Sequence, residues 1–222
     1  MTKSISDIRS STRDSSLPSR HGNPFATCWT KPGALAFRFP CGESAERLID
    51  RLAANSWWGE IVGPHGSGKS TLLETLKPLL AGAGRDLVAI ALRDHQRRLP
   101  RGFVQRILAT SHPLVIVDGY EQLSRLSRCW LKWQCRRRSA GLLVMSHAAT
   151  GLPPLIRLQP DFELVERLVT ALTEERPSAV TAHDIAASHA RYGSNVRELL
   201  FALYDRHEAA CRAIRTGPSS AA

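Results

Sequence analysis

Residues 60–71 read EIVGPHGSGKST. Within them, Gly63, Gly68, Lys69 and Ser70 satisfy G-x-x-x-x-G-K-[ST], the pattern of a loop that wraps a polyphosphate. Glycines suit such a loop because they permit tight turns and let backbone N–H groups approach the ligand closely. The sequence therefore predicts nucleotide binding by nine consecutive residues: Gly63, Pro64, His65, Gly66, Ser67, Gly68, Lys69, Ser70 and Thr71.

The segments on either side give this loop the context it needs. WWGEIV before it predicts a buried strand, and TLLETLKPLL after it predicts a helix whose positive end faces the phosphates. Lys69 is predicted to reach the β- and γ-phosphates, and the Ser70 hydroxyl to hold Mg²⁺. The alternative is a glycine-rich turn without a ligand, which this context disfavours.

The overall composition is that of a globular protein. The chain has 222 residues, 43% hydrophobic and 23% charged, enough for one core and a small appendage. No apolar run approaches the about 20 residues of a membrane span, and the N-terminal residues lack the apolar centre of a secretory signal. Five cysteines without a C-x-x-C pair argue against a disulfide scaffold and a zinc site. We therefore expect a cytoplasmic protein with no membrane partner.

The net charge is +10, from 30 basic and 20 acidic residues. A basic balance favours an anionic partner such as nucleic acid. However, 25 of the basic residues are arginine, and abundant arginine also follows from a biased genome composition. The overall charge therefore adds little to the nucleotide prediction.

Strand and helix patterns alternate along the middle of the chain. Five apolar segments predict strands, at 57–62, 86–92, 112–118, 141–146 and 155–159. This alternation predicts an α/β fold of three layers, α/β/α, with a five-stranded, mainly parallel sheet and a small C-terminal helical lid. The expected division is a disordered tail (1–22), a core with an N-terminal arm (23–160), the lid (161–215) and a frayed tail (216–222). Thr181 and Asp184 predict a capping box in the lid.

This order of motifs resembles the AAA+ branch of the P-loop ATPases over residues 41–214. The loop, or Walker A motif, follows the first strand, an aspartate ends the third strand, a polar residue ends the fourth, and helices follow. The resemblance implies the sheet order 5-1-4-3-2. It also implies that Asp118 is the Walker B aspartate, which would hold Mg²⁺ together with Ser70. As an alternative, Asp118 would only cap the following helix.

Three further residues match positions that bind or sense nucleotide in this family. Ser146, which ends LLVMS, matches the polar sensor near the γ-phosphate, and His147 resembles the switch histidine of transporter-type ATPases. Arg197, in GSNVRELL, looks like the arginine that reaches the γ-phosphate from the lid. The alternatives are a satisfied polar group at a strand end and a solvated arginine.

The sequence also departs from the family pattern. Gly119 stands where the catalytic glutamate directly follows the aspartate, and Glu121 comes two positions later. Glu121 is a candidate catalytic base if the chain turns back toward the site, or a helix N-terminal charge if it does not. HAATGLPP, between the last two strands, contains no match to the arginine finger, and no LSGGQ-like signature precedes Asp118.

These observations predict a protein that binds ATP and Mg²⁺. Lys69, Asp118, Glu121 and Arg197 are the candidate catalytic residues. We expect a slow ATPase or ATP-gated switch that acts on a protein or nucleic-acid partner. The alternatives are a phosphotransferase, because small-molecule kinases share this loop, and an ATP-binding protein that does not hydrolyse its ligand.

The segment 120–138 predicts a single helix with two faces. The apolar face is predicted to point into the core and consists of Leu123, Leu126, Trp130 and Trp133. The basic face is a candidate nucleic-acid contact and consists of Arg125, Arg128, Lys132 and Arg136. The alternative for that face is simple solvation. Its tryptophans are predicted to pack in the core rather than stack on bases.

Two other segments are candidates for ligand contact. The basic run Arg93–Arg101 is expected near the carboxyl edge of the sheet, where it would face a second phosphate-bearing partner. The arm around Asn23–Phe25 is expected to lie over the adenine, as N-terminal segments do in similar ATPases.

Overall fold

The computed structural model describes residues 22–93, 95–174 and 176–215. The predicted tails, 1–22 and 216–222, lie outside these residues apart from Gly22. Among the described residues, no helix is both long enough and apolar enough to cross a membrane.

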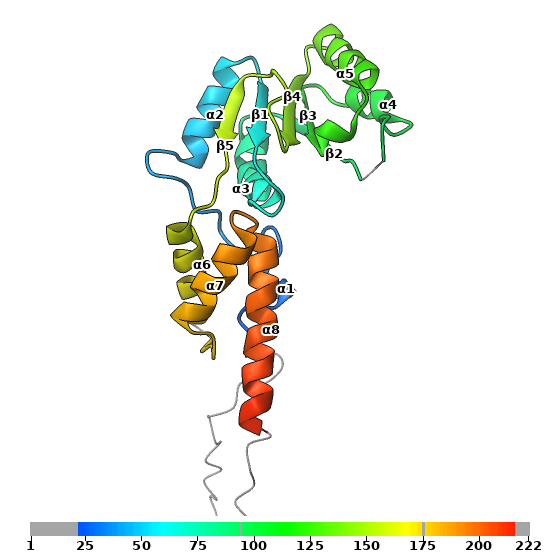
Figure 1. The fold of residues 1–222 in the computed structure, drawn as a ribbon. Helices are drawn as coiled ribbons and strands as arrows, with labels where there is room; N and C mark the ends of the chain where they lie inside the picture. The colour runs from blue at the N-terminus through cyan, green and yellow to red at the C-terminus, as the bar shows by residue number, and fades with distance from the viewer. Residues whose placement is uncertain (1–21, 94, 175, 216–222) are drawn as a thin grey trace, which may run out of the picture.

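A five-stranded sheet forms the centre of the fold (Figure 1). Its strands are β1 (Trp58–Val62), β2 (Asp86–Ala91), β3 (Pro113–Asp118), β4 (Gly141–Ser146) and β5 (Pro154–Arg157). The spatial order is β2-β3-β4-β1-β5 and every pairing is parallel, which confirms the order that the resemblance implied. All of β4 and nearly all of β3 are buried, as expected of apolar strands in a parallel sheet.

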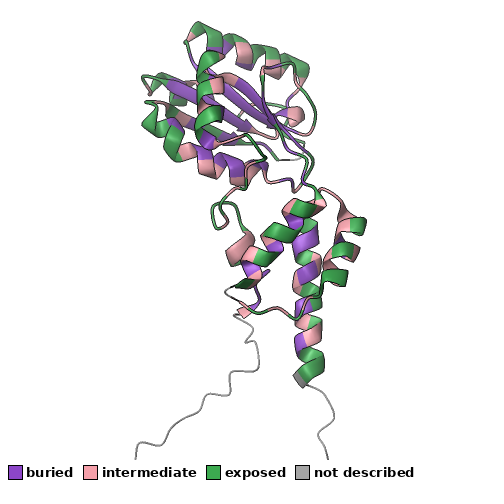
Figure 2. Cartoon of the chain, turned by 90° about the vertical axis from the view of Figure 1, so that its left-hand side faces the viewer, coloured by how far each residue is buried: buried purple, intermediate pink, exposed green. Residues whose placement is uncertain are grey.

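Helices cover both faces of the sheet. One face carries α2 (Ala45–Ala54) and α3 (Lys69–Gly82), and the other carries α4 (Phe103–Leu108) and α5 (Arg125–Arg137). Successive residues of β3 alternate between the faces, because strand side chains point to opposite sides. Leu114 and Ile116 pack with α2 and α3, whereas Val115 and Val117 pack with α4 and α5. The predicted three-layer arrangement is therefore confirmed (Figure 2).

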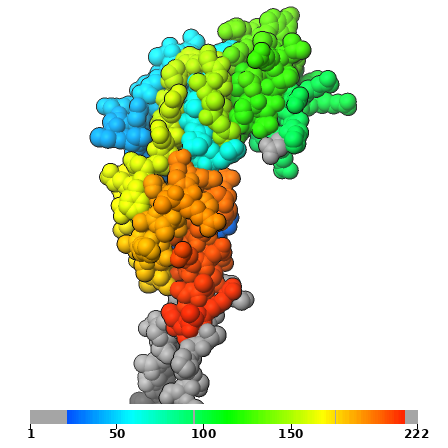
Figure 3. All heavy atoms as spheres, viewed as in Figure 1, coloured from blue at the N-terminus to red at the C-terminus, as the bar shows by residue number. Residues whose placement is uncertain are grey.

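Three helices follow the sheet and form the C-terminal helical unit, namely α6 (Phe162–Glu174), α7 (Ala182–Tyr192) and α8 (Val196–Arg215). This unit has a hydrophobic cluster of its own, which includes Leu199 and Leu203 of α8 and also Phe25 from the N-terminal arm. The capping box predicted at Thr181 and Asp184 is present at the start of α7. Figure 3 shows the unit beneath the sheet, at the end opposite to α5.

The predicted helix 120–138 is in fact two elements. A 3₁₀ turn, η2, spans Tyr120–Gln122, Leu123 is extended, and α5 starts afresh with Ser124 as its N-cap. Within α5 the buried residues are Leu131, Gln134 and Cys135. The prediction of an apolar core face was wrong for three of its four members, because Leu126, Trp130 and Trp133 are exposed.

The packing of α3 against the sheet predicts a graded response to truncation. Leu76 is fully buried, whereas Leu79 on the same helix is 36% exposed. We expect Leu76→Ala to lower the free energy of unfolding by about 2–5 kcal/mol, since it leaves a cavity in the core. Leu79→Ala is the matched control and should cost less than about 1 kcal/mol, in line with exposed positions generally. Urea denaturation measures both, and equal losses would contradict the assigned packing.

Candidate nucleotide-binding site

The glycine loop turns sharply between β1 and α3. A Cβ atom on Gly63 would lie 2.6 Å from Ser67 Oγ and 3.0 Å from the Leu158 carbonyl oxygen, so a larger residue does not fit there. Gly66 and Gly68 have φ angles of +70° and +91°, which L side chains rarely adopt. Gly68 is the N-cap of α3, and the first N–H groups of that helix face the loop, where they are suited to an anion.

Lys69 sits at the centre of the loop. Its Nζ donates hydrogen bonds to the carbonyls of Gly63, at 2.6 Å, and Pro64, at 2.7 Å. Burial lowers the pKa of this ammonium, Asp118 and Glu121 oppose that shift, and Arg197 adds to it. A charge that is partly removed from water and has no carboxylate of the described residues within hydrogen-bond distance is well placed to meet an anionic ligand.

Ser70 and Asp118 meet at the end of β3. The Ser70 hydroxyl lies 3.5 Å from Asp118 Oδ2, so the structure brings together the two residues predicted to hold Mg²⁺. No group of three or more His, Cys, Asp or Glu in the described part of the chain could hold a metal ion. Two protein oxygens fit Mg²⁺ bound together with phosphates and water, which is the usual way that Mg²⁺ binds with nucleotides.

Glu121 returns to the site because the chain turns immediately after Asp118. Gly119 has φ of +76°, and the η2 turn that follows carries Glu121 back to the pocket wall. Glu121 Oε1 lies 3.0 Å from His147 Nε2. Tyr120 is fully buried beneath the turn, and this burial raises the pKa of its hydroxyl to about 12. The turn is therefore anchored in the core.

Arg128 of α5 also holds this turn in place. Its Nη2 donates to the Glu121 carbonyl at 2.7 Å, and its Nε donates to the Leu123 carbonyl at 2.9 Å. The guanidinium lies 5.2 Å from the centre of the Tyr120 ring. Arg128 was predicted to contact nucleic acid, but here its donors are used to support the turn that carries Glu121.

His65 and His147 stack at the mouth of the loop, with ring centres 3.6 Å apart. His147 Nδ1 lies 3.4 Å from Lys69 Nζ and 3.2 Å from the Gly63 carbonyl oxygen. Ser146, by contrast, is 1% exposed and donates its hydroxyl hydrogen bond to the Ala148 carbonyl at 2.7 Å. The role of Ser146 as a γ-phosphate sensor stays a prediction.

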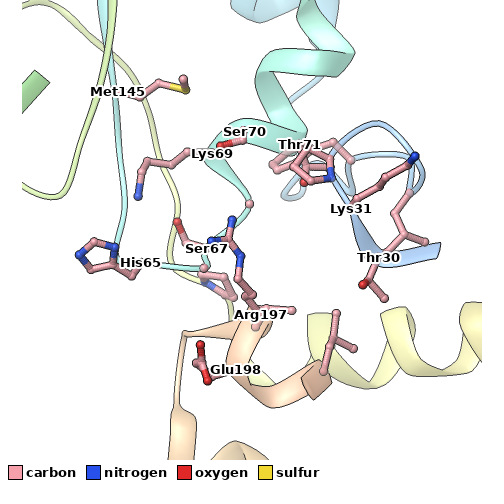
Figure 4. A pocket seen from close by; sticks show the side chains of 18 of the residues that line it. Thr30, Lys31, His65, Ser67, Lys69, Ser70, Thr71, Met145, Arg197 and Glu198 are labelled. Atoms are coloured by element: carbon pink, nitrogen blue, oxygen red, sulfur yellow. The ribbon is translucent and has the colours of Figure 1, made fainter. Parts of the chain in front are cut away.

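The C-terminal helical unit reaches the loop directly. A Cβ atom on Gly66 would lie 1.9 Å from Asn195 Oδ1 and 3.1 Å from Arg197 Cβ. Figure 4 shows Arg197 beside Ser67, with Glu198 next to it. Arg197 thus lies at the pocket, and its predicted contact with the γ-phosphate stays a prediction. Asn195, two residues before it, was not among the predicted residues, because an asparagine at a helix start has no distinctive sequence signature.

Lys69, Ser70, Asp118, Glu121 and Arg197 all line one pocket of about 760 Å³. The N-terminal arm forms its second wall, from Thr27 to Arg38, and the apolar residues Leu164, Leu168 and Leu200 of α6 and α8 complete it. The expected position of Asn23–Phe25 over the base was wrong. Asn23 instead donates to the Tyr204 carbonyl, and Phe25 is buried among the C-terminal helices.

Two polar atoms in the wall of this pocket are buried and have no hydrogen-bond partner among the described residues. They are Ser67 Oγ, in the glycine loop, and Glu121 Oε2, in the η2 turn. Burial without a partner costs free energy unless a ligand or water supplies one. The Ser67 hydroxyl can donate to a phosphate oxygen, whereas Glu121 Oε2 can only accept, for example from water.

Comparison with known proteins gives matches by structure alone. No protein-family model matches the sequence, and no curated protein matches it. A structure described as a DNA replication initiation factor superposes with a TM-score of 0.56 at 13% identity, covering 77% of this chain and 61% of that one. DnaA from Aquifex aeolicus, bound to AMPPCP, gives a TM-score of 0.50 at 15% identity, covering 72% of this chain and 61% of that one.

The chain has the fold of an AAA+-like P-loop ATPase. At such low identity the likeness concerns the fold alone. The chain also spans only about three-fifths of the length of either protein.

Position 119 explains the main departure from the AAA+ pattern. A Cβ atom there would lie 2.8 Å from the Leu92 carbonyl oxygen, and φ is positive. A glutamate directly after Asp118 is therefore incompatible with this backbone. After Asp118, the next carboxylate along the chain that lines the pocket is Glu121.

Gly119→Ala tests this constraint, and Gly102→Ala is its matched control. Gly102 has a nearly equal φ of +79°, but nothing lies within 4 Å of its added Cβ. Both changes carry the left-handed backbone penalty of about 1–2 kcal/mol. We expect Gly119→Ala to lower the free energy of unfolding clearly further, because the backbone of Leu92 would have to move. Equal losses in denaturant unfolding would show that the contact with Leu92 imposes no constraint.

Proposed function

We propose that this protein binds ATP together with Mg²⁺ and hydrolyses it slowly. The observation that carries the proposal is the meeting of the Lys69 ammonium, the start of α3 and the Ser70–Asp118 pair in one pocket. That AMPPCP is bound in the structure of DnaA, which shares this fold, agrees with the proposal.

In this proposal the phosphates lie on residues 63–71. Backbone N–H groups of the loop and of the first turn of α3 would donate to the phosphate oxygens. Lys69 would exchange its carbonyl partners for the β- and γ-phosphates. Ser70 and Asp118 would hold Mg²⁺, which neutralises charge that develops on the phosphate oxygens.

The base and ribose would occupy the apolar part of the pocket. Leu35 and Phe37 of the arm face this space from one side, and Leu164, Leu168 and Leu200 face it from the other. Apolar walls with a few polar groups are typical of sites that bind a base. The arm thus has the role first expected for Asn23–Phe25, through residues that lie further along the chain.

Glu121 is the proposed general base for hydrolysis. Its Oε2 is buried and has no hydrogen-bond partner among the described residues, while Oε1 contacts His147. As the base, Oε2 would accept a hydrogen bond from the attacking water once nucleotide binding makes room beside it. A His147 tautomer with the proton on Nε2 donates to Glu121 and leaves Nδ1 to accept from Lys69. His147 would then act as a positioning residue. Because the same contact restrains Glu121, we expect slow turnover.

The C-terminal helical unit, residues 161–215, is the proposed lid on a core of residues 23–160. Arg197 would reach the γ-phosphate. Because Asn195 lies against Gly66, a movement of the glycine loop would also move the start of α8. Such a contact supports a switch in which nucleotide occupancy changes the position of the lid. The proposed partner of that switch is a nucleic acid or another protein.

Calorimetric titration with ATP, in Mg²⁺ and in EDTA, tests the binding. We expect Lys69→Ala to weaken ATP binding by about 2 kcal/mol or more, because it removes charge-assisted hydrogen bonds to phosphate. Lys77→Ala, a surface change on the same helix at a residue paired with Glu74, is the control and should bind as wild type. ATP binding that is independent of Lys69 would contradict the assigned site.

Steady-state release of phosphate tests the hydrolysis. Glu121→Gln keeps the shape of the side chain and removes its basicity. We expect this variant to retain ATP binding and to lose turnover by about 100-fold or more if Glu121 is the base. Wild-type turnover no faster than that of Lys69→Ala would instead identify an ATP-binding protein that does not cut its ligand, an outcome favoured by the His147 contact on Glu121.

A further inference from the structure

Basic residues are concentrated in one part of the chain. Residues 95–140 contain ten Arg and Lys but only two acidic residues, Asp118 and Glu121, both of which line the nucleotide pocket. The rest of the chain contains twenty basic and eighteen acidic residues. A general compositional bias would raise the charge everywhere. The excess belongs instead to α4, α5 and the segments around them.

The outer face of α5 carries aromatic rings within this basic region. Leu126, Trp130 and Trp133 are 83%, 42% and 51% exposed and follow one another at helical spacing. Arg137 continues the line, with its guanidinium 5.3 Å from the centre of the Trp133 ring. We call Leu126, Trp130, Trp133 and Arg137 the α5 aromatic row. Large apolar side chains that gather on a surface mark a contact site more often than chance exposure.

Positive charge borders the row, and α5 contains no acidic residue. Arg125 and Arg136 are exposed beside it, and the Arg136 guanidinium lies 5.0 Å from the centre of the Trp58 ring. Ser124 N and Ser127 Oγ donate to the Arg97 carbonyl at 3.1 Å and 2.8 Å. These bonds hold Arg97, within the second basic segment, against the start of α5.

We propose that the α5 aromatic row and its basic border bind single-stranded nucleic acid. Unpaired bases stack on exposed tryptophans, and arginines neutralise the phosphates between them. A duplex keeps its base faces covered by neighbouring bases, so it would use the charges but not the rings. A protein partner without strong negative charge would use the rings but leave the arginines unpaired.

No residue of α5 lines the nucleotide pocket, so this surface is separate from it. Single-stranded nucleic acid would be the partner of the proposed nucleotide-dependent switch, and in that sense the proposal rests on the proposed function. The binding itself needs no ATP. It can therefore be measured on its own, and its failure is distinguishable from a failure of ATP binding.

The test is fluorescence anisotropy of a labelled oligothymidylate of about 20 nucleotides, longer than one typical single-strand site. The full chain is titrated without ATP. We expect Trp133→Ala to weaken binding roughly tenfold, and Trp133→Phe to recover most of the loss because it keeps a ring. Arg167→Gln on α6, an exposed arginine outside this surface, controls for general loss of positive charge and should bind as wild type. Thermal unfolding by circular dichroism checks that each variant is folded.

The arginines have a readout of their own. The double change Arg125→Gln with Arg136→Gln should reduce the salt dependence of binding, by about one unit of slope for each phosphate contact removed. Lys69→Ala should bind the oligonucleotide as wild type while it loses ATP. If wild type fails to bind ATP but binds the oligonucleotide through Trp133, only the proposed nucleotide function fails.

Three outcomes would overturn the inference. One is equal affinity of wild type and Trp133→Ala for the oligonucleotide. Another is tighter binding of a duplex of the same length. The third is a change in self-association of Trp133→Ala, seen by sedimentation, with oligonucleotide affinity unchanged. That result would make the row an interface between copies of the chain.

Discussion

The parallel register of β1, β4 and β3 is the constraint on which the site depends. Val62 pairs with Ser146, and Asp118 pairs with Met145, so the three strands end side by side at one edge of the sheet. The glycine loop, the Gly119 turn and His147 therefore leave the sheet together. Because the strands are buried on both faces, a shift by one residue would turn their apolar side chains the wrong way. The hydrophobic core thus sets the distances between the polar groups of the pocket.

The turn at Gly119 also shapes the pocket. Its positive φ and the nearby Leu92 carbonyl exclude any larger side chain from the position after Asp118. The same turn brings Glu121 to the pocket and buries Tyr120 beneath it. The carboxylate of Glu121 thus reaches the pocket from the η2 turn and not from the end of β3. It is in contact with His147. If Glu121 is the base, as proposed, this contact with His147 would restrain it and slow hydrolysis.

The two proposed binding surfaces share one piece of chain. The η2 turn that carries Glu121 leads through Leu123 into α5, and Arg128 of α5 donates to the Glu121 carbonyl. The α5 aromatic row lies on the outer side of that same helix. A ligand on the row and a nucleotide in the pocket therefore act on opposite ends of one connected segment. Reciprocal coupling follows only if this segment has two arrangements that each ligand favours differently.

Sequence alone determined the loop, the strands, their parallel arrangement and the three C-terminal helices, because apolar periodicity and glycine spacing are local properties. It also predicted Lys69, Ser70 and Asp118 as candidates, and the fold brings these three residues into one pocket. Tertiary structure decided what depends on long-range packing. It broke the segment 120–138 at Leu123, turned Trp130 and Trp133 outward, placed residues 27–38 at the pocket and brought Asn195 to Gly66. A helix pattern shows which residues share a face, but only the elements packed around it decide which face is buried.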